Sequence, residues 1–215
     1  MGPDKIYYCK ECKKYSTNKE LCGHEREFLF SRKQQVKLSK FLSYIFRHNP
    51  QQLGIELDEN GFSQISVDEL IILIKKDARF SWLNRQKLEA LVQLDPKGRF
   101  EIKNERFRCR YGHSLKNISL NDLYKNVPQI LYHGTNLKAY EKIVSDGLKP
   151  MGRNLVHLTL SIPDAKMVAR RHGGQMVILE IDALQAQKDG IEIFQASPTI
   201  FVAKYIPKKY IKRIF

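Results

Sequence analysis

Two histidine-containing segments in the second half of the sequence have residue types that suit a ligand site. In Leu131–Thr135 a strand-like run delivers His133, Gly134 and Thr135 to a predicted loop, and a later strand-like run delivers His157. Two imidazoles placed in this way can hydrogen-bond the two riboses of a dinucleotide. Short motifs also occur by chance, so the alternative is a pair of buried histidines near turns.

A second group of chemically capable residues lies near the N-terminus. Cys9 and Cys12 form a C-x-x-C pair, and Cys22, Gly23 and His24 follow after nine intervening residues. Zinc prefers four thiolate or imidazole ligands in a tetrahedron, and a glycine allows the second pair to bend tightly. We therefore predict a closed structural zinc site, with no catalytic metal. The alternative is a set of free thiols in a flexible arm.

The charge of the chain indicates a polyanionic partner. The formal net charge is +14 and the isoelectric point is about 9.6. The first 120 residues hold 23 basic and 15 acidic side chains and the rest hold 14 and 8, so the excess is not confined to a tail. A field of this sign attracts nucleic acid first, although a basic protein without such a partner is the alternative.

Membrane and export signals are missing from the sequence. Hydrophobic residues make up 42% of the chain, which is enough for folded cores, but they form no run of about 18 apolar residues. The polar N-terminus has no apolar signal-peptide core. We therefore expect no membrane partner and a cytoplasmic location, and no obligate protein partner is evident.

Three segments are predicted, and together they indicate an α+β protein. Residues 1–30 form the zinc module, and residues 31–122 follow as helices and a terminal hairpin, an arrangement that suggests a winged-helix lobe. Apolar residues at helical spacing predict a helix that ends before Pro50, Ser66 and Glu69 form a capping box for a second, and a third runs from 85 to 94. Strands are predicted at 99–103 and 106–111, and residues 123–215 read as a mixed α/β lobe without a Rossmann or P-loop motif.

The second hairpin strand carries three arginines on one face. Arg106, Arg108 and Arg110 alternate with apolar residues, so their side chains share a side of the strand. Like charges in a row are unfavourable unless they are solvated or matched by anions. Phosphate is one match, because guanidinium binds it with two hydrogen bonds, and a solvated edge is the alternative.

Between residues 36 and 210, several short motifs follow one another in order. They are Leu38-Ser39-Lys40-Phe41-Leu42-Ser43 before Arg47-His48; Gly61-Phe62; Arg99-Phe100; Arg108 with Gly112-His113-Ser114; Tyr132-His133-Gly134-Thr135; Gly147-Leu148; Met151 with Arg153; Val156-His157-Leu158; and Arg171-His172-Gly173. In this order they resemble the NAD-dependent RNA 2′-phosphotransferases, which include enzymes that remove the splice-junction 2′-phosphate of tRNA. The N-terminal cysteine segment resembles an extra module of archaeal members.

This resemblance implies a winged-helix lobe and an ADP-ribosyltransferase-like, NAD-binding lobe. It also implies that an RNA 2′-phosphate, on a tRNA-like substrate, is transferred to NAD+, which is consumed as a co-substrate. An ADP-ribosylated RNA 2′-phosphate is the intermediate, and the products are 2′-OH RNA, nicotinamide and ADP-ribose 1″,2″-cyclic phosphate. The alternative is an enzyme that stops after ADP-ribosylating terminal nucleic-acid phosphates.

The resemblance also assigns roles to single residues. Arg47, His48, Arg108 and Arg171 would be catalytic, with the arginines binding the 2′-phosphate and His48 able to donate a proton to the leaving 2′-oxygen. Arg171 is preferred to its neighbour Arg170 because it directly precedes His172-Gly173. His133, Gly134, Thr135 and His157 would hold NAD+. The segment Ser197–Phe201 departs from the family pattern, which usually has Asn-Gly-Val there.

Overall fold

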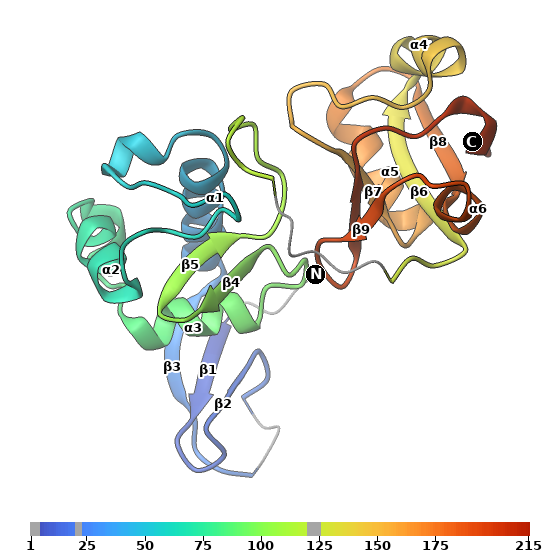
Figure 1. Ribbon diagram of the computed structural model, residues 1–215. Helices are drawn as coiled ribbons and strands as arrows, with labels where there is room; N and C mark the ends of the chain where they lie inside the picture. Colours follow the sequence, from blue (N-terminus) through green and yellow to red (C-terminus); the bar gives the residue numbers. More distant parts are fainter. Residues whose placement is uncertain (1–4, 20–22, 120–125) are drawn as a thin grey trace. The chain divides into compact units, whose positions relative to one another are not determined.

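The computed structural model describes residues 5–19, 23–119 and 126–215, and these form two compact units (Figure 1). The first unit comprises Met1–Arg110 with Asn117–Ser119, and the second comprises Tyr111–Lys116 with Leu120–Phe215. The sequence-based boundary at 122/123 lies outside the described residues. Each unit has its own set of buried hydrophobic residues.

The first unit begins with a three-stranded antiparallel sheet that was not predicted from the sequence. Its strands β1 (Lys5–Cys9), β2 (Lys14–Ser16) and β3 (Glu27–Ser31) lie in the order β2-β1-β3. Phe30 is fully buried with its ring centroid 5.5 Å from that of Trp82, and the hydroxyl of Tyr15 donates to Glu89 at 3.1 Å. The N-terminal segment is therefore packed against the rest of this unit and is more than a metal-binding loop.

Three α-helices follow, at the positions that the apolar spacing and capping residues predict. They are α1 (Arg32–His48), α2 (Val67–Lys75) and α3 (Arg85–Gln93), with short 3-10 helices η1 (Pro50–Leu53) and η2 (Ala78–Phe80). Ser31 ends β3 and also caps α1, where it forms a capping box with Gln34. The first sheet and α1 are thus joined without a linker, and α1 ends at His48, with Asn49 as its C-cap, before Pro50 as predicted.

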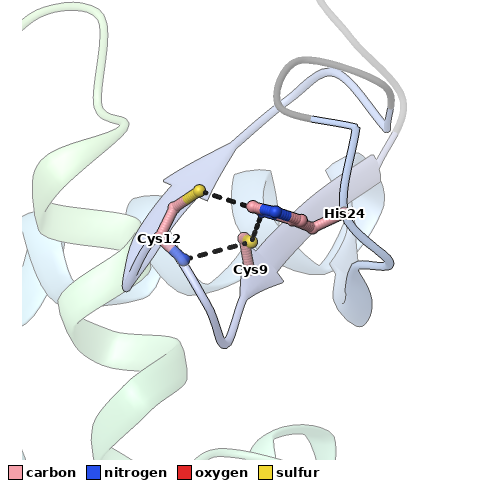
Figure 2. Close-up of side chains that lie close together, drawn as sticks. All are labelled: Cys9, Cys12 and His24. Atoms are coloured by element: carbon pink, nitrogen blue, oxygen red, sulfur yellow. Dashed lines mark hydrogen bonds between the residues drawn. The ribbon is translucent and has the colours of Figure 1, made fainter.

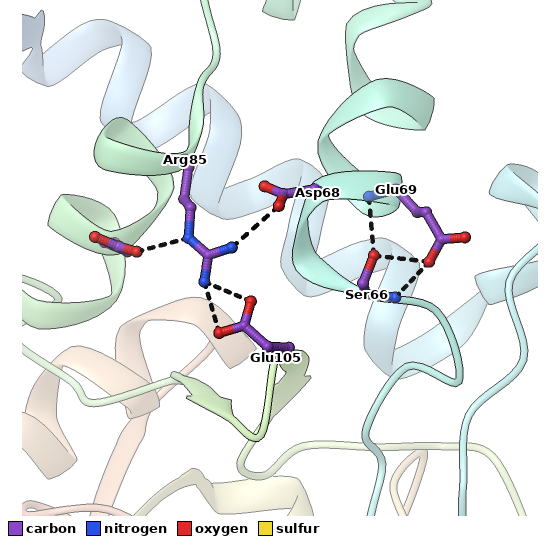
Figure 3. Close-up of polar contacts among 6 residues, drawn as sticks. Ser66, Asp68, Glu69, Arg85 and Glu105 are labelled. Carbon is purple, nitrogen blue, oxygen red and sulfur yellow. Dashed lines mark hydrogen bonds and ion pairs between the residues drawn. The ribbon is translucent and has the colours of Figure 1, made fainter.

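The hairpin of strands β4 (Phe100–Lys103) and β5 (Arg106–Cys109) completes the first unit. Its two turn residues, Asn104 and Glu105, have φ values of 50° and 60°, which a two-residue turn of this kind requires. Arg85 at the start of α3 binds the Glu105 carboxylate at 2.6 and 2.8 Å and Asp68 in α2 at 3.1 Å (Figure 3). The same guanidinium therefore holds the hairpin tip to two helices.

The second unit is built on a six-stranded sheet in which every neighbouring pair is antiparallel. Its order is β11-β8-β6-β7-β10-β9, with β6 (Ile130–Asn136), β7 (Val156–Thr159), β8 (Met176–Asp182), β9 (Ile193–Gln195), β10 (Ile200–Ala203) and β11 (Ile211–Arg213). The helices are α4 (Leu137–Asp146), α5 (Ile162–His172) and α6 (Ala183–Lys188), with η3 (Lys208–Tyr210).

The core of the second unit lies on both faces of this sheet. Leu131, Leu158 and Leu179 are fully buried in the larger cluster, and Ala165 and Ala169 of α5 pack on Ile178 in a smaller one. Among the described residues, every helix is too short or too polar to cross a lipid bilayer.

Candidate active site

The end of α1 presents two of the four residues assigned to catalysis. Arg47 and His48 occupy its last turn, the helix-end position predicted from Pro50. Arg47 is buried and His48 is exposed, with its ring centroid 6.3 Å from that of Tyr44. The α1 sequence contains no Asp or Glu, so no carboxylate of the helix itself reduces the positive charge of this end.

Arg47 lies beside Cys109, the last residue of β5. Burial raises the pKa of the Cys109 thiol to about 11, and the nearby positive charge of Arg47 opposes this rise only in part. The thiol is therefore protonated near neutral pH, which argues against Cys109 as a nucleophile.

Arg108 in β5 is held rigidly by its surroundings. Its Nε donates to Oε2 of Glu101 at 2.7 Å, and its Nη1 donates to the main-chain oxygen of Asn60 at 3.0 Å. Its guanidinium carbon lies 4.3 Å from the ring centroid of Phe62, and the residue is only 4% exposed. A guanidinium fixed in this way loses little conformational freedom when it binds an anion.

The structure adds a partner to the arginine row that the sequence-based interpretation, phosphate ligands or a solvated edge, did not include. Glu101 binds Arg110 at 3.2 Å as well as Arg108, so one carboxylate is shared by two of the three arginines and the group keeps a net positive charge. Arg106 is exposed. Glu101 was missed at the level of sequence, although the hairpin register pairs it directly with Arg108, and this cross-strand pairing could have revealed it.

His133, Gly134 and Thr135 lie inside β6, which corrects the prediction that they stand in a loop. The strand continues to Asn136, which caps α4. Gly134 faces α5, and a Cβ at this position would lie 1.8 Å from the main-chain oxygen of Ala165. Only glycine allows this close approach, so Gly134 has a packing role whatever it does toward a ligand.

His133 is kept neutral by its environment. Its Nδ1 lies 2.9 Å from the main-chain oxygen of His157, so Nδ1 carries the proton and Nε2 is the acceptor. Burial lowers the pKa of His133, and the charge of His172 lowers it further, against the opposing effect of the hydrogen bond to His157. The ring of His157 lies 5.9 Å from that of Tyr111. The two histidine segments are thus connected by a hydrogen bond from the His133 side chain to the main chain of His157.

Arg171 lies in the last turn of α5 together with Arg170 and His172, and all three are exposed. The loop that follows lines an open cavity of about 480 Å³ with the end of β6 and the start of α4. The lining residues are Asn136, Leu137, Lys138, Glu141, His172, Gly173, Gly174 and Gln175. Arg47, His48 and Arg108 belong to the first unit, whereas Arg171 and the two histidine segments belong to the second.

Three of the four predicted zinc ligands lie together at the N-terminal sheet. The ligand atoms of Cys9, Cys12 and His24 are all within 4.8 Å of one another (Figure 2). The Nδ1 atom of His24 is 3.9 Å from Sγ of Cys9 and 3.4 Å from Sγ of Cys12. A tetrahedral zinc ion separates such ligand atoms by about 3.5 Å, so this group fits the metal. The fourth predicted ligand, Cys22, lies outside the described residues.

The chain thus has a mixed α/β fold with clustered basic side chains in both units. Residues 33–204 match the family model described as RNA 2′-phosphotransferase, Tpt1 / KptA family. The chain belongs to this family.

Several curated archaeal proteins are similar over most of this chain. A protein named probable RNA 2′-phosphotransferase 1 from Archaeoglobus fulgidus is 37% identical over 210 residues, which is 98% of this chain and 95% of that protein. Probable RNA 2′-phosphotransferases of Hyperthermus butylicus and Pyrococcus horikoshii are 36% and 37% identical. The match to the Hyperthermus protein covers 94% of this chain and 89% of that protein, and the match to the Pyrococcus protein covers 80% of this chain and 95% of that protein.

Proposed function

We propose that this protein removes a 2′-phosphate from RNA by transferring it to NAD+. An oxygen of the 2′-phosphate attacks the anomeric carbon of the nicotinamide ribose and nicotinamide leaves. The neighbouring ribose hydroxyl then attacks the phosphorus, which releases RNA with a 2′-hydroxyl and forms ADP-ribose 1″,2″-cyclic phosphate. Membership of the family over residues 33–204 is the observation that carries this proposal.

The first unit would supply the phosphate-binding groups. Arg108 is pre-positioned by Glu101, Asn60 and Phe62, so it can bind a phosphate without ordering a flexible side chain. Arg47 adds a second buried guanidinium on the same unit. His48 is exposed at the helix end, where as a cation it could protonate the leaving 2′-oxygen. Arg171 of the second unit would be the third phosphate ligand.

The donor set of the second unit fits a dinucleotide. His133 is neutral with Nε2 as an acceptor, so it can accept a hydrogen bond from a ribose hydroxyl. His157 in β7 and Thr135 in β6 would add further polar contacts, and Gly134 would keep α5 close to β6. Bound NAD+ would supply the electrophilic ribose carbon. We assign this unit to the ADP-ribosyltransferase-like folds and the helices and hairpin of the first unit to the winged-helix folds.

Product analysis with an RNA that carries one internal 2′-phosphate tests the proposal. With labelled NAD+ we expect release of ADP-ribose 1″,2″-cyclic phosphate and an RNA that has lost its phosphate. An RNA that retains ADP-ribose would instead support the alternative, which is ADP-ribosylation of nucleic-acid phosphates without the second step. If neither product forms, the proposed function is wrong.

We also propose that the N-terminal sheet binds one structural zinc ion through Cys9, Cys12, Cys22 and His24. With the fourth ligand included, all positions of a tetrahedron would be filled by protein, which leaves no open position for catalysis. Metal analysis should find about one zinc per chain, and Cys9 and Cys12 should resist alkylation until the metal is removed. A protein with much less than one zinc and reactive Cys9 and Cys12 would contradict this assignment.

A further inference from the structure

One exposed face of α1 carries a row of cationic and aromatic side chains. Lys33, Lys37, Lys40, Tyr44 and His48 are spaced by four, three, four and four residues, so they lie along one side of the helix. All five are exposed, and Tyr44 is 48% exposed. At 1.5 Å per residue the row extends over about 22 Å and ends at the residue that we assign to proton transfer.

The lysine charges of this row are not matched by carboxylates. In the part of the chain that the structure describes, Lys33, Lys37 and Lys40 make no ion pair, whereas Arg79 and Arg85 in the same unit each bind carboxylates. Like charges three and four residues apart destabilise a helix, and α1 has no acidic residue to offset them. Binding of an anionic partner would relieve this repulsion.

We propose that this face of α1 binds the backbone of the RNA strand that carries the 2′-phosphate, and leads it to His48. The three lysines would each neutralise a backbone phosphate, and Tyr44 would stack on an unpaired base. The combination of a basic track with an exposed aromatic ring is typical of surfaces that bind single-stranded nucleic acid. This inference rests on the proposed function, because it assumes that the substrate is RNA.

The test compares two triple variants with equal charge changes. Lys33, Lys37 and Lys40 are replaced by Gln in one protein, and the exposed residues Lys75, Lys76 and Lys103 are replaced by Gln in the control. Binding of a single-stranded, 2′-phosphorylated RNA is measured by fluorescence anisotropy over a salt series. The α1 variant should bind on the order of tenfold more weakly, and the slope of log K against log salt should fall by about 2, which corresponds to three lost phosphate contacts on a single strand.

Tyr44 provides a second test that does not change charge. Tyr44→Phe keeps the ring and should bind RNA like the wild type, whereas Tyr44→Leu should weaken binding roughly tenfold, as is typical for loss of one stacked base. Equal binding by the Leu and Phe variants would contradict the stacking role.

The outcomes separate this inference from the proposed function. Equal weakening of both triple variants would mean that RNA is held by a diffuse field, and wild-type binding by the α1 variant would mean that the row is not used; either result overturns the inference. Turnover of the wild type is measured separately. Failure to release ADP-ribose cyclic phosphate contradicts the proposed function, while the salt series still decides whether α1 binds RNA.

Discussion

Arg108 illustrates how the fold prepares one side chain for chemistry. Glu101 and the main-chain oxygen of Asn60 contact all three nitrogens of its guanidinium, and Phe62 covers one face. Positioning of this kind has a catalytic value, because a group that is already aligned needs no reorganisation in the transition state. It also has a structural value, because a buried guanidinium without Glu101 would be unfavourable.

Replacement of Arg108 by Ala should therefore separate catalysis from binding. We expect the rate of 2′-phosphate removal to fall about 100-fold or more, because a charged donor that stabilises the transition state is lost. Most RNA affinity should remain, since many other cations contribute to it. The rate and the RNA dissociation constant are measured together with the melting temperature.

The matched control is Arg106→Ala, which removes an exposed arginine from the same strand. It should change the rate by less than about threefold, because an exposed side chain of this kind contributes little. If Arg108→Ala retains full turnover, the assigned role is wrong. If it loses RNA binding and turnover by the same factor, Arg108 acts in binding only.

Gly134 gives a prediction about stability at a single residue. A methyl group there would overlap the main-chain oxygen of Ala165, and backbone atoms of α5 cannot move aside as a flexible side chain can. We expect Gly134→Ala to lower the free energy of unfolding of the second unit by about 3 kcal/mol, at the upper end for overpacked cores.

Chemical denaturation followed by circular dichroism measures this effect, and Gly152→Ala is the control. A Cβ at Gly152 would have no neighbouring atom within 4 Å, and this glycine has no positive φ, so its replacement should leave the midpoint almost unchanged. Similar midpoints for the two variants would show that α5 does not pack on β6 as closely as described.

At the scale of elements, local signals predicted the three α-helices of the first unit and the sheets less completely. The Ser66–Glu69 capping box is present in α2, where the main-chain nitrogen of Ser66 donates to the Glu69 carboxylate at 2.8 Å. A capping box and a helical apolar spacing depend on residues within one turn, so they can be read from the sequence. The strands β1, β2 and β3 were missed, because each is short and their pairing depends on contacts between distant segments.

The features of the candidate site also separate into those that local sequence predicts and those that depend on tertiary packing. The helix-end position of Arg47 and His48 follows from Pro50 and was predicted correctly. The main-chain partner of His133 and the close approach of α5 to Gly134 depend on how strands and helices pack, so no local pattern contains them. The roles assigned to these residues came from the family resemblance and remain predictions.

The position of the β4–β5 hairpin depends on Arg85, which gives a prediction at this scale. Arg85 binds Glu105 at the hairpin tip and Asp68 and Glu89 on the helices (Figure 3). Single exposed ion pairs contribute little, but one guanidinium with three partners forms a network. We expect Arg85→Ala to lower the free energy of unfolding of the first unit by about 1 kcal/mol.

The control is Arg79→Ala, which removes an exposed arginine whose ion pair is with Asp77, two residues away. It should have a smaller effect, because this ion pair connects no distant elements. Denaturation followed by tryptophan fluorescence measures both. An equal effect of the two variants would mean that the network does not hold the hairpin.

The whole molecule combines two units with separate cores, and the N-terminal sheet is an integral part of the first. The family model begins at residue 33, so this sheet precedes the segment that the family shares. In this chain it packs through Phe30 on Trp82 and continues directly into α1. A metal bound to the sheet should therefore stabilise the whole first unit, and α1 in particular. The stability of the second unit should not change.

Removal of zinc should accordingly unfold one unit before the other. The chain has a single tryptophan, Trp82, so its fluorescence reports on the first unit alone. A chelator should lower the midpoint of this transition by about 10 °C, since structural zinc contributes several kcal/mol to folding. Amide hydrogen exchange of β6 and β8 should stay unchanged. Added zinc should restore the transition, and Cys9→Ser should abolish the response to chelator. An unchanged midpoint of the Trp82 fluorescence transition after chelation, or faster amide exchange in β6 and β8, would show that the metal does not stabilise the first unit selectively.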